Sequence, residues 1–213
     1  SLGVEVVITG QPSFAKTRER LECAEARLGR IAMLPRIGKA ILELLIIIAV
    51  TPVYTWGADH GGLPVVEAGL FRTRVLDLLW GVKRRMRCVP IVFTVIFRGH
   101  LVEPVSAMRY AALVQARRIL RARQDIREEV ERIWQARRDE PEVKAAGPVG
   151  RIAEVLQELG WEWKSPWVIG RPGLPDLPLL KGAQRWWLHE VREGVRHALV
   201  SEELRKHPRQ DME

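Results

Sequence analysis

EPVSAMRYAALVQARRILRARQDIREEVERIWQARRD, residues 103–139, is the stretch of sequence that decides the fold class. After Pro104 it contains no glycine and no proline, the residues that most often interrupt a helix. It is long enough for about ten helical turns. We therefore predict a long helical region here, built as one helix or as two with a bend between them, in a protein of mainly α fold.

The arginines of this region allow two interpretations. They could form a groove for RNA, or a solvated face on which arginines pair with acidic residues of the same helix. Several acidic residues lie three or four positions from an arginine, which is the spacing of ion pairs along a helix: Asp125, Glu128, Glu129 and Glu131. We favour the solvated, ion-paired face, and the part before Gln124 is the more basic one.

Toward the N-terminus the sequence predicts one short strand and a helix. Residues 4–9, VEVVIT, are mostly β-branched and are followed by Gly10, which indicates a strand with a turn after it. Residues 14–34 repeat apolar side chains every three or four positions, which predicts a helix: Phe14, Leu21, Ala24, Leu28 and Ile31.

The most apolar part of the chain is AILELLIIIAVTPV, residues 40–53. It predicts a helix that ends near Pro52. It contains Glu43 and is shorter than the roughly 20 residues that span a bilayer. We interpret it as a buried core helix, and association with a membrane surface is the alternative.

Between this run and the long helical region the sequence predicts a loop and two further segments. Residues 57–64, GADHGGLP, have the composition of a loop. Residues 65–80 have helical periodicity, with Arg72 and Arg74 on the exposed face. Residues 89–97, VPIVFTVIF, combine a strand-like content of β-branched residues with helical surroundings, and we favour a helix.

The C-terminal part begins with a stretch that has the composition of a linker, at residues 141–150. A helix is predicted over residues 151–159. Residues 161–180, WEWKSPWVIGRPGLPDLPLL, contain three tryptophans and repeated prolines, and we expect them to be irregular and to lie over a helix surface. A final helix is predicted to start at Lys181, and we expect Trp186 and Trp187 to fill a helix-packing core. The alternative for the tryptophans is that, beside arginines, they stack on single-stranded bases.

The charge of the chain favours a polyanionic partner. Its 213 residues include 34 basic and 26 acidic side chains, for a formal net charge of +8. Such an excess attracts nucleic acid first. All but seven of the basic residues are arginines, whose planar guanidinium suits phosphates. The alternative is that the bias reflects composition, in which case the chain is a non-enzymatic helical interaction or scaffold protein.

No catalytic centre can be recognised in the sequence. Polymerases and nucleases hold Mg²⁺ between carboxylates that converge from strand ends. The aspartates here lie in a loop, on predicted helix faces, in linkers or in the tail: Asp59, Asp77, Asp125, Asp139, Asp176 and Asp211. The most site-like string, Asp59-His60 between Ala58 and two glycines, is explained equally well by a loop turn. We predict no catalytic residue, no metal ligand and no cofactor in this chain.

The cysteines and the N-terminus indicate the setting of the protein. Cys23 and Cys88 lie far apart, and neither has a partner at the spacing of a metal site. Two cysteines do not form a disulfide framework in a chain this long, so we expect an intracellular location, in the nucleus or cytoplasm. Ser1 and the residues after it do not resemble an initiator or a signal peptide, and we expect the chain to be cut from a longer reading frame.

Four motifs occur in an order that resembles the region downstream of the palm in reverse transcriptases of non-LTR retroelements. LGVEVVITG, residues 2–10, resembles the strand that introduces the thumb. RLECAEARLGRIAMLP, residues 20–35, is similar to the first thumb helix, and KAILELLIIIAVTPVYTWGAD, residues 39–59, is similar to the helix that follows it. LGWEWKSPW, residues 159–167, followed by WWLHEVREGVR, residues 186–196, resembles the connector before the C-terminal region of the element.

The resemblance implies an order of domains along the chain. Residues 1–60 would form a helical thumb-like bundle with one short N-terminal strand, and residues 61–140 a helical connector with a long basic helix. Residues 141–150 would be a linker, and residues 151–213 a second, Trp-rich helical region.

The resemblance also implies a function. The parent would be an RNA-directed DNA polymerase that uses Mg²⁺, with its catalytic aspartates upstream of Ser1, so this fragment alone is not expected to be active. A thumb contacts phosphates of the template–primer duplex without reading sequence. The matching candidates are Arg27, Arg30, Arg36 and Lys39, which would bind an RNA–DNA hybrid or RNA. The expected partners are nucleic acid and the remainder of the polymerase, and not a membrane.

Overall fold

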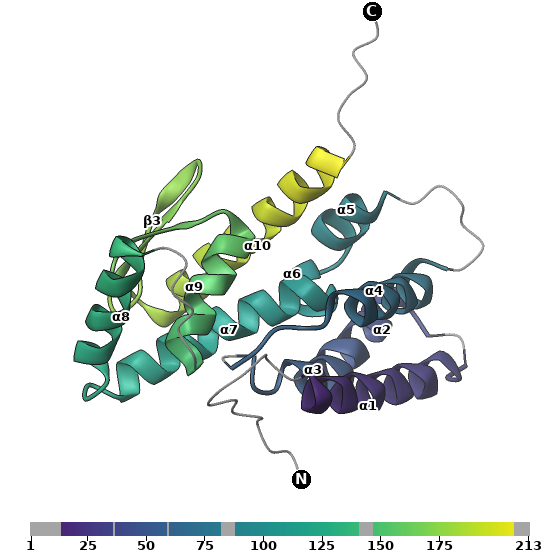
Figure 1. Cartoon of the computed structure of the whole chain (residues 1–213). Coiled ribbons are helices and arrows are strands. Elements are labelled where there is room, and N and C mark those ends of the chain that lie inside the picture. Colours follow the sequence, from purple (N-terminus) through teal and green to yellow (C-terminus); the bar gives the residue numbers. More distant parts are fainter. Residues whose placement is uncertain (1–13, 36, 59, 82–87, 141–146, 207–213) are drawn as a thin grey trace, which may run out of the picture.

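The structure is a computed structural model that describes residues 14–35, 37–58, 60–81, 88–140 and 147–206. Helices form most of it, and one small antiparallel sheet lies in the C-terminal half (Figure 1). This arrangement confirms the mainly α fold class. The strand expected at residues 4–9 lies outside the described residues.

The N-terminal half consists of consecutive helical segments: α1 (Ala15–Ala32), α2 (Lys39–Leu45), the π-helical turn η1 (Ile46–Val50), α3 (Thr51–Thr55) and α4 (Val65–Trp80). The helix expected at residues 14–34 is confirmed by α1. Its buried side chains follow the predicted periodicity and include Leu21, Ala24, Leu28 and Ile31. This face of α1 packs against η1, α3 and α4.

The apolar run continues as a helix beyond Pro52, to Thr55. A proline has no N–H to donate, so a regular helix would lose the bond to the carbonyl four residues back. The backbone widens into η1 just before the proline, and the Thr51 N–H donates to the carbonyl of Ile46, five residues back. The proline then falls in the first turn of α3, where it needs no donor.

The same run is buried on one face only. Its inward face carries Leu42, Ile46 and Val50, and its outward face carries Ile41, Leu44 and Ile48. Ile48 is 61% exposed. The interpretation as a buried core helix therefore holds for one side of the helix and is wrong for the other.

The predicted helix at residues 65–80 is confirmed by α4, but one of its arginines lies elsewhere than expected. Arg72 is largely buried, and its Nε lies 3.2 Å from the Glu103 carboxylate. Arg74 pairs with Glu25 of α1. Both arginines thus join α4 to neighbouring elements.

The segment before the long helical region is helical, as favoured. It consists of α5 (Val89–Ile91), the π-helical turn η2 (Val92–Ile96) and the short α6 (Gly99–Val102). Gly99 is required here, because a Cβ on this residue would collide with the carbonyl oxygen of Phe93.

The long helical region forms two helices with a bend, α7 (Pro104–Ala122) and α8 (Arg127–Asp139). Glu103 caps α7, since its carboxylate accepts a hydrogen bond from the Ser106 N–H at 2.6 Å. At the other end Arg123 has an extended backbone, with φ −112° and ψ 96°. Its guanidinium pairs with Asp125 at 2.6 Å inside the bend.

The C-terminal half contains α9 (Gly147–Leu159), the strands β1 (Glu162–Ser165), β2 (Val168–Arg171) and β3 (Leu174–Pro178), and α10 (Gln184–Lys206). The first helix begins earlier than predicted, because Pro148 fits the first turn of a helix. Of the linker expected at residues 141–150, residues 147–150 are helical and the rest lies outside the described residues.

The stretch expected to be irregular is an antiparallel sheet in the order β1-β2-β3. That expectation is wrong because the prolines fall where a sheet tolerates them. Pro166 lies in the turn between β1 and β2, Pro172 lies in the turn between β2 and β3, and Pro175 lies on an edge strand. The C-terminal region is therefore helical with a small sheet, rather than helical throughout.

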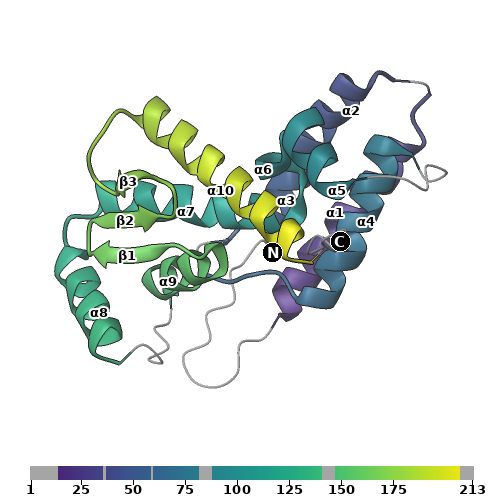
Figure 2. The same ribbon diagram turned by 90° about the horizontal axis from the view of Figure 1, so that it is seen from above.

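Two hydrophobic cores are joined by the shared helices α7 and α10. Figure 2 shows the ribbon of both helices. One core lies among α1, η1, α4 and η2, and the other among α7, α9, the sheet and α10. In α7, Ala107 belongs to the first core and Met108 to the second. Trp187 is fully buried in the second core, as expected, whereas Trp186 is 41% exposed. Within the described residues, no helix has the length and hydropathy needed to cross a bilayer.

Candidate nucleic-acid interface

The structure places three of the four candidate phosphate contacts on the N-terminal helices. Arg27 and Arg30 lie three residues apart on α1, and both are exposed. Lys39 is exposed at the start of α2, with its Nζ 4.2 Å from the centre of the Trp80 ring. Arg36 lies outside the described residues.

Two of these cations also make contacts within the protein. Nη1 of Arg27 donates to the carbonyl oxygen of Ala49 at 2.8 Å, which ties α1 to η1. The contact of Lys39 with the Trp80 ring ties α2 to α4. Both side chains thus have a structural role beside any role in phosphate binding.

A second basic surface lies in the C-terminal half, where the sequence pointed to no site. A cleft of about 630 Å³ opens between α8, α9 and β1. Its walls combine aromatic, basic and apolar side chains, and we call it the tryptophan cleft: Trp134, Arg137, Arg138, Ala153, Leu156, Gln157, Trp161, Glu162, Trp163 and Lys164.

The tryptophans of this cleft are held in place by their neighbours. The Trp134 indole N–H donates to the carbonyl oxygen of Trp163 at 2.8 Å, which joins α8 to β1. Trp161 is 7% exposed. Its ring packs against Gly194 of α10, where a Cβ would collide with it. The expectation that the tryptophans of this stretch lie over a helix is confirmed at Trp161, whose ring contacts α10, and at Trp167, whose indole N–H donates to Glu131 of α8 at 3.2 Å.

Cations lie at the rim of the cleft. Arg137 and Arg138 occupy the last turn of α8, and the Arg138 guanidinium carbon lies 5.6 Å from the centre of the Trp134 ring. Nζ of Lys164 lies 2.9 Å from Asp176 on β3, and this carboxylate raises the pKa of the lysine. Glu162 contributes one acid to the lining.

Aromatic rings beside cations can bind an unpaired base and its phosphate. The rings stack on the face of the base, and the cations attract the backbone, without dependence on sequence. The adjacent Arg138 and Trp134 already show the geometry of a cation over an indole. The alternative is a purely structural role, in which these tryptophans only pack β1 on α8 and α9.

Other arginines belong to the protein interior. Arg117 of α7 is 1% exposed, and its guanidinium carbon lies 4.6 Å from the centre of the Trp187 ring. It donates to the carbonyl oxygens of Lys181 and Gly182 at 3.0 and 2.8 Å. Arg171 of β2 is equally enclosed, and it pairs with Glu190 of α10 at 2.8 Å.

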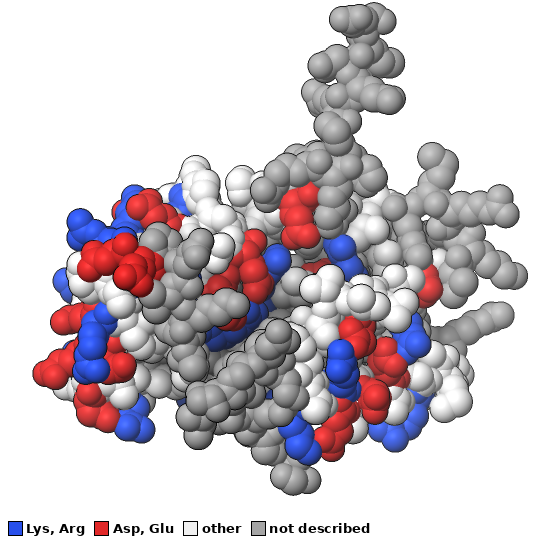
Figure 3. Space-filling model, in the orientation of Figure 1, with Lys and Arg blue, Asp and Glu red and all other residues white. Residues whose placement is uncertain are grey.

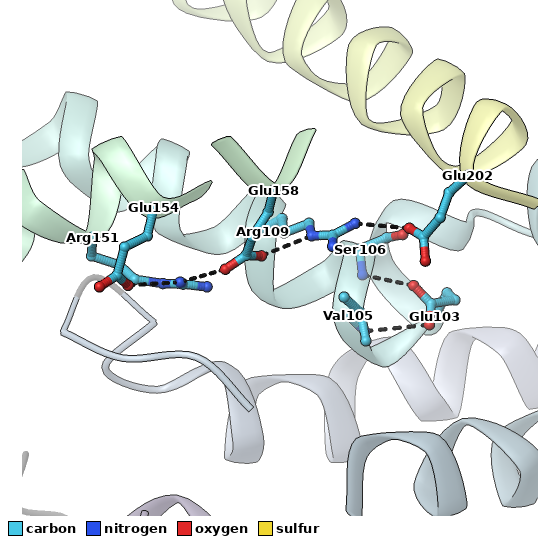
Figure 4. A network of polar contacts seen from close by, with 8 residues as sticks. All are labelled: Glu103, Val105, Ser106, Arg109, Arg151, Glu154, Glu158 and Glu202. Atoms are coloured by element: carbon cyan, nitrogen blue, oxygen red, sulfur yellow. Dashed lines mark hydrogen bonds and ion pairs between the residues drawn. The ribbon is translucent and has the colours of Figure 1, made fainter. Parts of the chain in front are cut away.

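A chain of ion pairs joins α7, α9 and α10 (Figure 4). Arg109 pairs with Glu158 at 2.9 Å and with Glu202 at 3.3 Å. Arg151 pairs with the same Glu158 at 2.7 Å and with Glu154 at 3.1 Å. Burial alone would raise the pKa of Glu158, but Arg151 and Arg109 outweigh it and hold this pKa below its usual value.

These contacts divide the long arginine-rich region in two. On α8 the favoured interpretation is confirmed, because Arg132 is exposed and pairs with Glu129 one turn earlier at 2.7 Å. On α7 it is wrong for Arg109 and Arg117, which face the C-terminal core. The more basic part of the region is thus partly internal.

The Asp59-His60 string, which is the most site-like of the sequence, gains no support for catalysis from the structure. His60 is an exposed turn residue, and Asp59 lies outside the described residues. Across the part of the chain that the structure describes, no three His, Cys, Asp or Glu side chains are grouped as metal ligands would be.

Sequence reasoning missed the tryptophan cleft, although a signal for it exists. Arginines follow a tryptophan by three and four residues in WQARR, residues 134–138, and a lysine follows two tryptophans in WEWK, residues 161–164. Each string is weak alone, and only the fold brings them together. The sequence matches no protein-family model, and comparisons with curated proteins and with solved structures find no significant match.

Proposed function

We propose that this chain is a nucleic-acid-binding region of an RNA-directed DNA polymerase of the non-LTR retroelement kind. The order of four sequence motifs supports the family. The tryptophan cleft is the observation that carries the binding function, since it sets the partly exposed indoles of Trp134 and Trp163 beside three cations. The polymerase chemistry would be performed by another part of the parent protein.

In this proposal two surfaces contact nucleic acid in different ways. Arg27, Arg30, Arg36 and Lys39 contact phosphates of an RNA–DNA hybrid, as the thumb resemblance implies. The tryptophan cleft takes unpaired bases of a single strand. Contacts of the first kind release counterions, so affinity for the hybrid falls steeply with salt.

The test measures binding of a labelled RNA–DNA hybrid and of a single-stranded RNA at several salt concentrations. We expect both to bind at low salt and to dissociate as salt rises. Replacing Trp163 by Ala should weaken single-strand binding by about tenfold, since stacking one base contributes roughly 1–3 kcal/mol. Trp186→Ala removes an exposed tryptophan outside the cleft and is the matched control.

The N-terminal surface has its own variants. Replacing Arg30, Arg36 and Lys39 together by Ala should weaken hybrid binding and reduce its dependence on salt. Binding of the single-stranded RNA should change less. Unchanged hybrid affinity in this variant would show that the thumb assignment is wrong, and binding that ignores salt would contradict the proposal as a whole.

A second function has two observations in its favour. Acidic and basic side chains are interspersed over the face shown in Figure 3, and several arginines make contacts inside the protein. A helical interaction or scaffold protein would have these features without binding nucleic acid. Failure of both nucleic acids to bind at low salt would favour this alternative.

A further inference from the structure

Among the described residues, a pocket of about 230 Å³ lies at the junction of the two halves. One wall comes from η2 and α6, including Thr94, Arg98 and His100, and the other comes from α10, including Arg192 and Arg196. This pocket shares no residue with the tryptophan cleft. It is several times larger than the roughly 30 Å³ of one water molecule.

Positive charge exceeds negative charge in the lining. Two of its three arginines have a carboxylate partner: Arg98 lies 3.3 Å from Glu43, and Arg196 lies 3.3 Å from Glu193. Glu43 is further engaged by the Arg98 backbone N–H at 2.6 Å. The positive charge of the remaining arginine, Arg192, is not matched by a carboxylate of the lining.

Arg192 differs from Arg98 and Arg196 because it has no carboxylate partner among the described residues. It is half-buried on α10, and its Nε is enclosed without a hydrogen-bond partner among the described residues. An Nε–H that is withdrawn from water and has no acceptor is unfavourable. An anion in the pocket would provide the missing acceptor.

His100 reports the electrostatic potential of the same place. Its ring lies edge-on to Tyr110, with centroids 5.1 Å apart and planes inclined at 74°. Burial, Arg192 and Arg98 lower the pKa of His100 to about 4. A neutral imidazole at physiological pH has one N–H to donate, and the arginines that disfavour its protonation would attract an anion.

We propose that this pocket, with Arg192 as its central contact and Arg98, Arg196 and His100 around it, binds a phosphate group. The planar guanidinium offers two parallel donors to the oxygens of a phosphate. The group could belong to a nucleic-acid backbone or to a free phosphate compound such as pyrophosphate. The pocket stands apart from the tryptophan cleft, so this inference does not depend on the proposed function.

The probes are inorganic pyrophosphate and a short single-stranded RNA, added separately to the full chain. Binding is followed by NMR of the His100 imidazole, which needs no activity as readout. We expect pyrophosphate to shift the His100 signal in a saturable way and to raise its pKa, because a bound anion favours the protonated ring. If the RNA gives the same shift and pyrophosphate competes with it, the source is a backbone phosphate. If only pyrophosphate acts, the source is a free phosphate compound.

Arg192→Ala should weaken pyrophosphate binding by about tenfold or more, since hydrogen bonds to a charged group are among the strongest in proteins. Arg192→Lys keeps the charge and should bind with intermediate affinity. Arg185→Ala removes an exposed arginine from the same helix outside the pocket and should bind as the unmodified chain does. Thermal unfolding of Arg192→Ala checks that the fold persists.

Two results would overturn the inference. One is a His100 signal that neither probe shifts at millimolar concentration. The other is a folded Arg192→Ala variant that binds pyrophosphate as tightly as the unmodified chain.

Discussion

The Arg117 guanidinium contacts one indole ring and two backbone carbonyl groups, and it is buried from solvent. It fills space beside Trp187 and connects α7 to the residues just before α10. Its Nε and Nη1 are enclosed and have no hydrogen-bond partner in the part of the chain that the structure describes. Packing and two hydrogen bonds of this side chain thus stabilise the folded protein, whereas its buried donors without an acceptor destabilise it.

Replacing Arg117 by Ala should lower the free energy of unfolding by about 3 kcal/mol, because it opens a cavity and leaves two carbonyls unmatched. Arg117→Met fills most of the volume and removes the unmatched donors, so it should cost less. Urea unfolding measures both. The neighbouring Arg118 is exposed, and Arg118→Ala should stay within about 0.5 kcal/mol of the unmodified chain. Equal losses at both positions would contradict this account of Arg117.

His100 makes stability depend on pH in a defined direction. In the unfolded chain its pKa is about 6.5. In the folded protein burial and the nearby Arg192 and Arg98 lower this pKa to about 4. The unfolded state therefore binds a proton first, and stability that is present above pH 6.5 is lost as the pH falls toward 4.

The variant His100→Gln cannot titrate, so its free energy of unfolding should fall less between pH 6.5 and pH 4 than that of the unmodified chain. Above this window the two curves should run parallel. Urea unfolding at a series of pH values gives the curves, and NMR gives the His100 midpoint directly. A midpoint near the ordinary value for histidine would remove the basis of this prediction.

At the scale of elements, helices followed from the sequence and the sheet did not. The periodicity of α1 and α4 and the absence of breakers in α7 and α8 are local properties, and they suffice to predict a helix. The sheet at residues 162–178 depends on where each proline falls in the strand order. Unless the pairing of the strands is known, prolines in turns or on an edge strand look the same as prolines of an irregular stretch.

The tryptophan cleft could not be predicted from the sequence for a related reason. Trp134 lies on α8 and Trp161 lies just before β1, and their approach follows from the way α8, α9 and the sheet pack. The thumb candidates follow from sequence motifs, and those among the described residues lie on two helices, with Arg27 and Arg30 on α1 and Lys39 on α2. A site assembled from three elements is visible only once their relative positions are known.

Two glycines give a matched prediction at this scale. Gly173 turns the chain between β2 and β3 with φ +70°, where a side chain is strained. Gly29 lies exposed inside α1, with open space where a Cβ would stand. Gly173→Ala should destabilise the protein by about 1 kcal/mol, and Gly29→Ala should stabilise it by about 0.5–1 kcal/mol. Thermal or urea unfolding measures the pair, and a change of the same sign in both would contradict the assignment of the turn.

At the scale of the whole molecule, the two hydrophobic cores are not independent. The helix α7 places Ala107 in one core and Met108 in the other. The helix α10 belongs mainly to the C-terminal core through Trp187 and Val191, yet Leu199 reaches the N-terminal core. Because both helices are continuous, loosening one core disturbs the elements that hold the other. We infer that the protein unfolds as one cooperative unit.

This inference predicts the effect of shortening Leu199. The residue is 4% exposed, so Leu199→Ala leaves a cavity and should lower the free energy of unfolding by about 3 kcal/mol. In a cooperative unit, hydrogen exchange of the most protected amides should accelerate equally in α1 and in α9. The clustered buried residues of α1 belong to the N-terminal core, and those of α9 belong to the C-terminal core. Val191→Ala, on the same helix but in the C-terminal core, is the mirror-image control and should affect both helices as well. If Leu199→Ala accelerates exchange in α1 alone and Val191→Ala in α9 alone, the halves unfold separately, and the shared helices do not couple them.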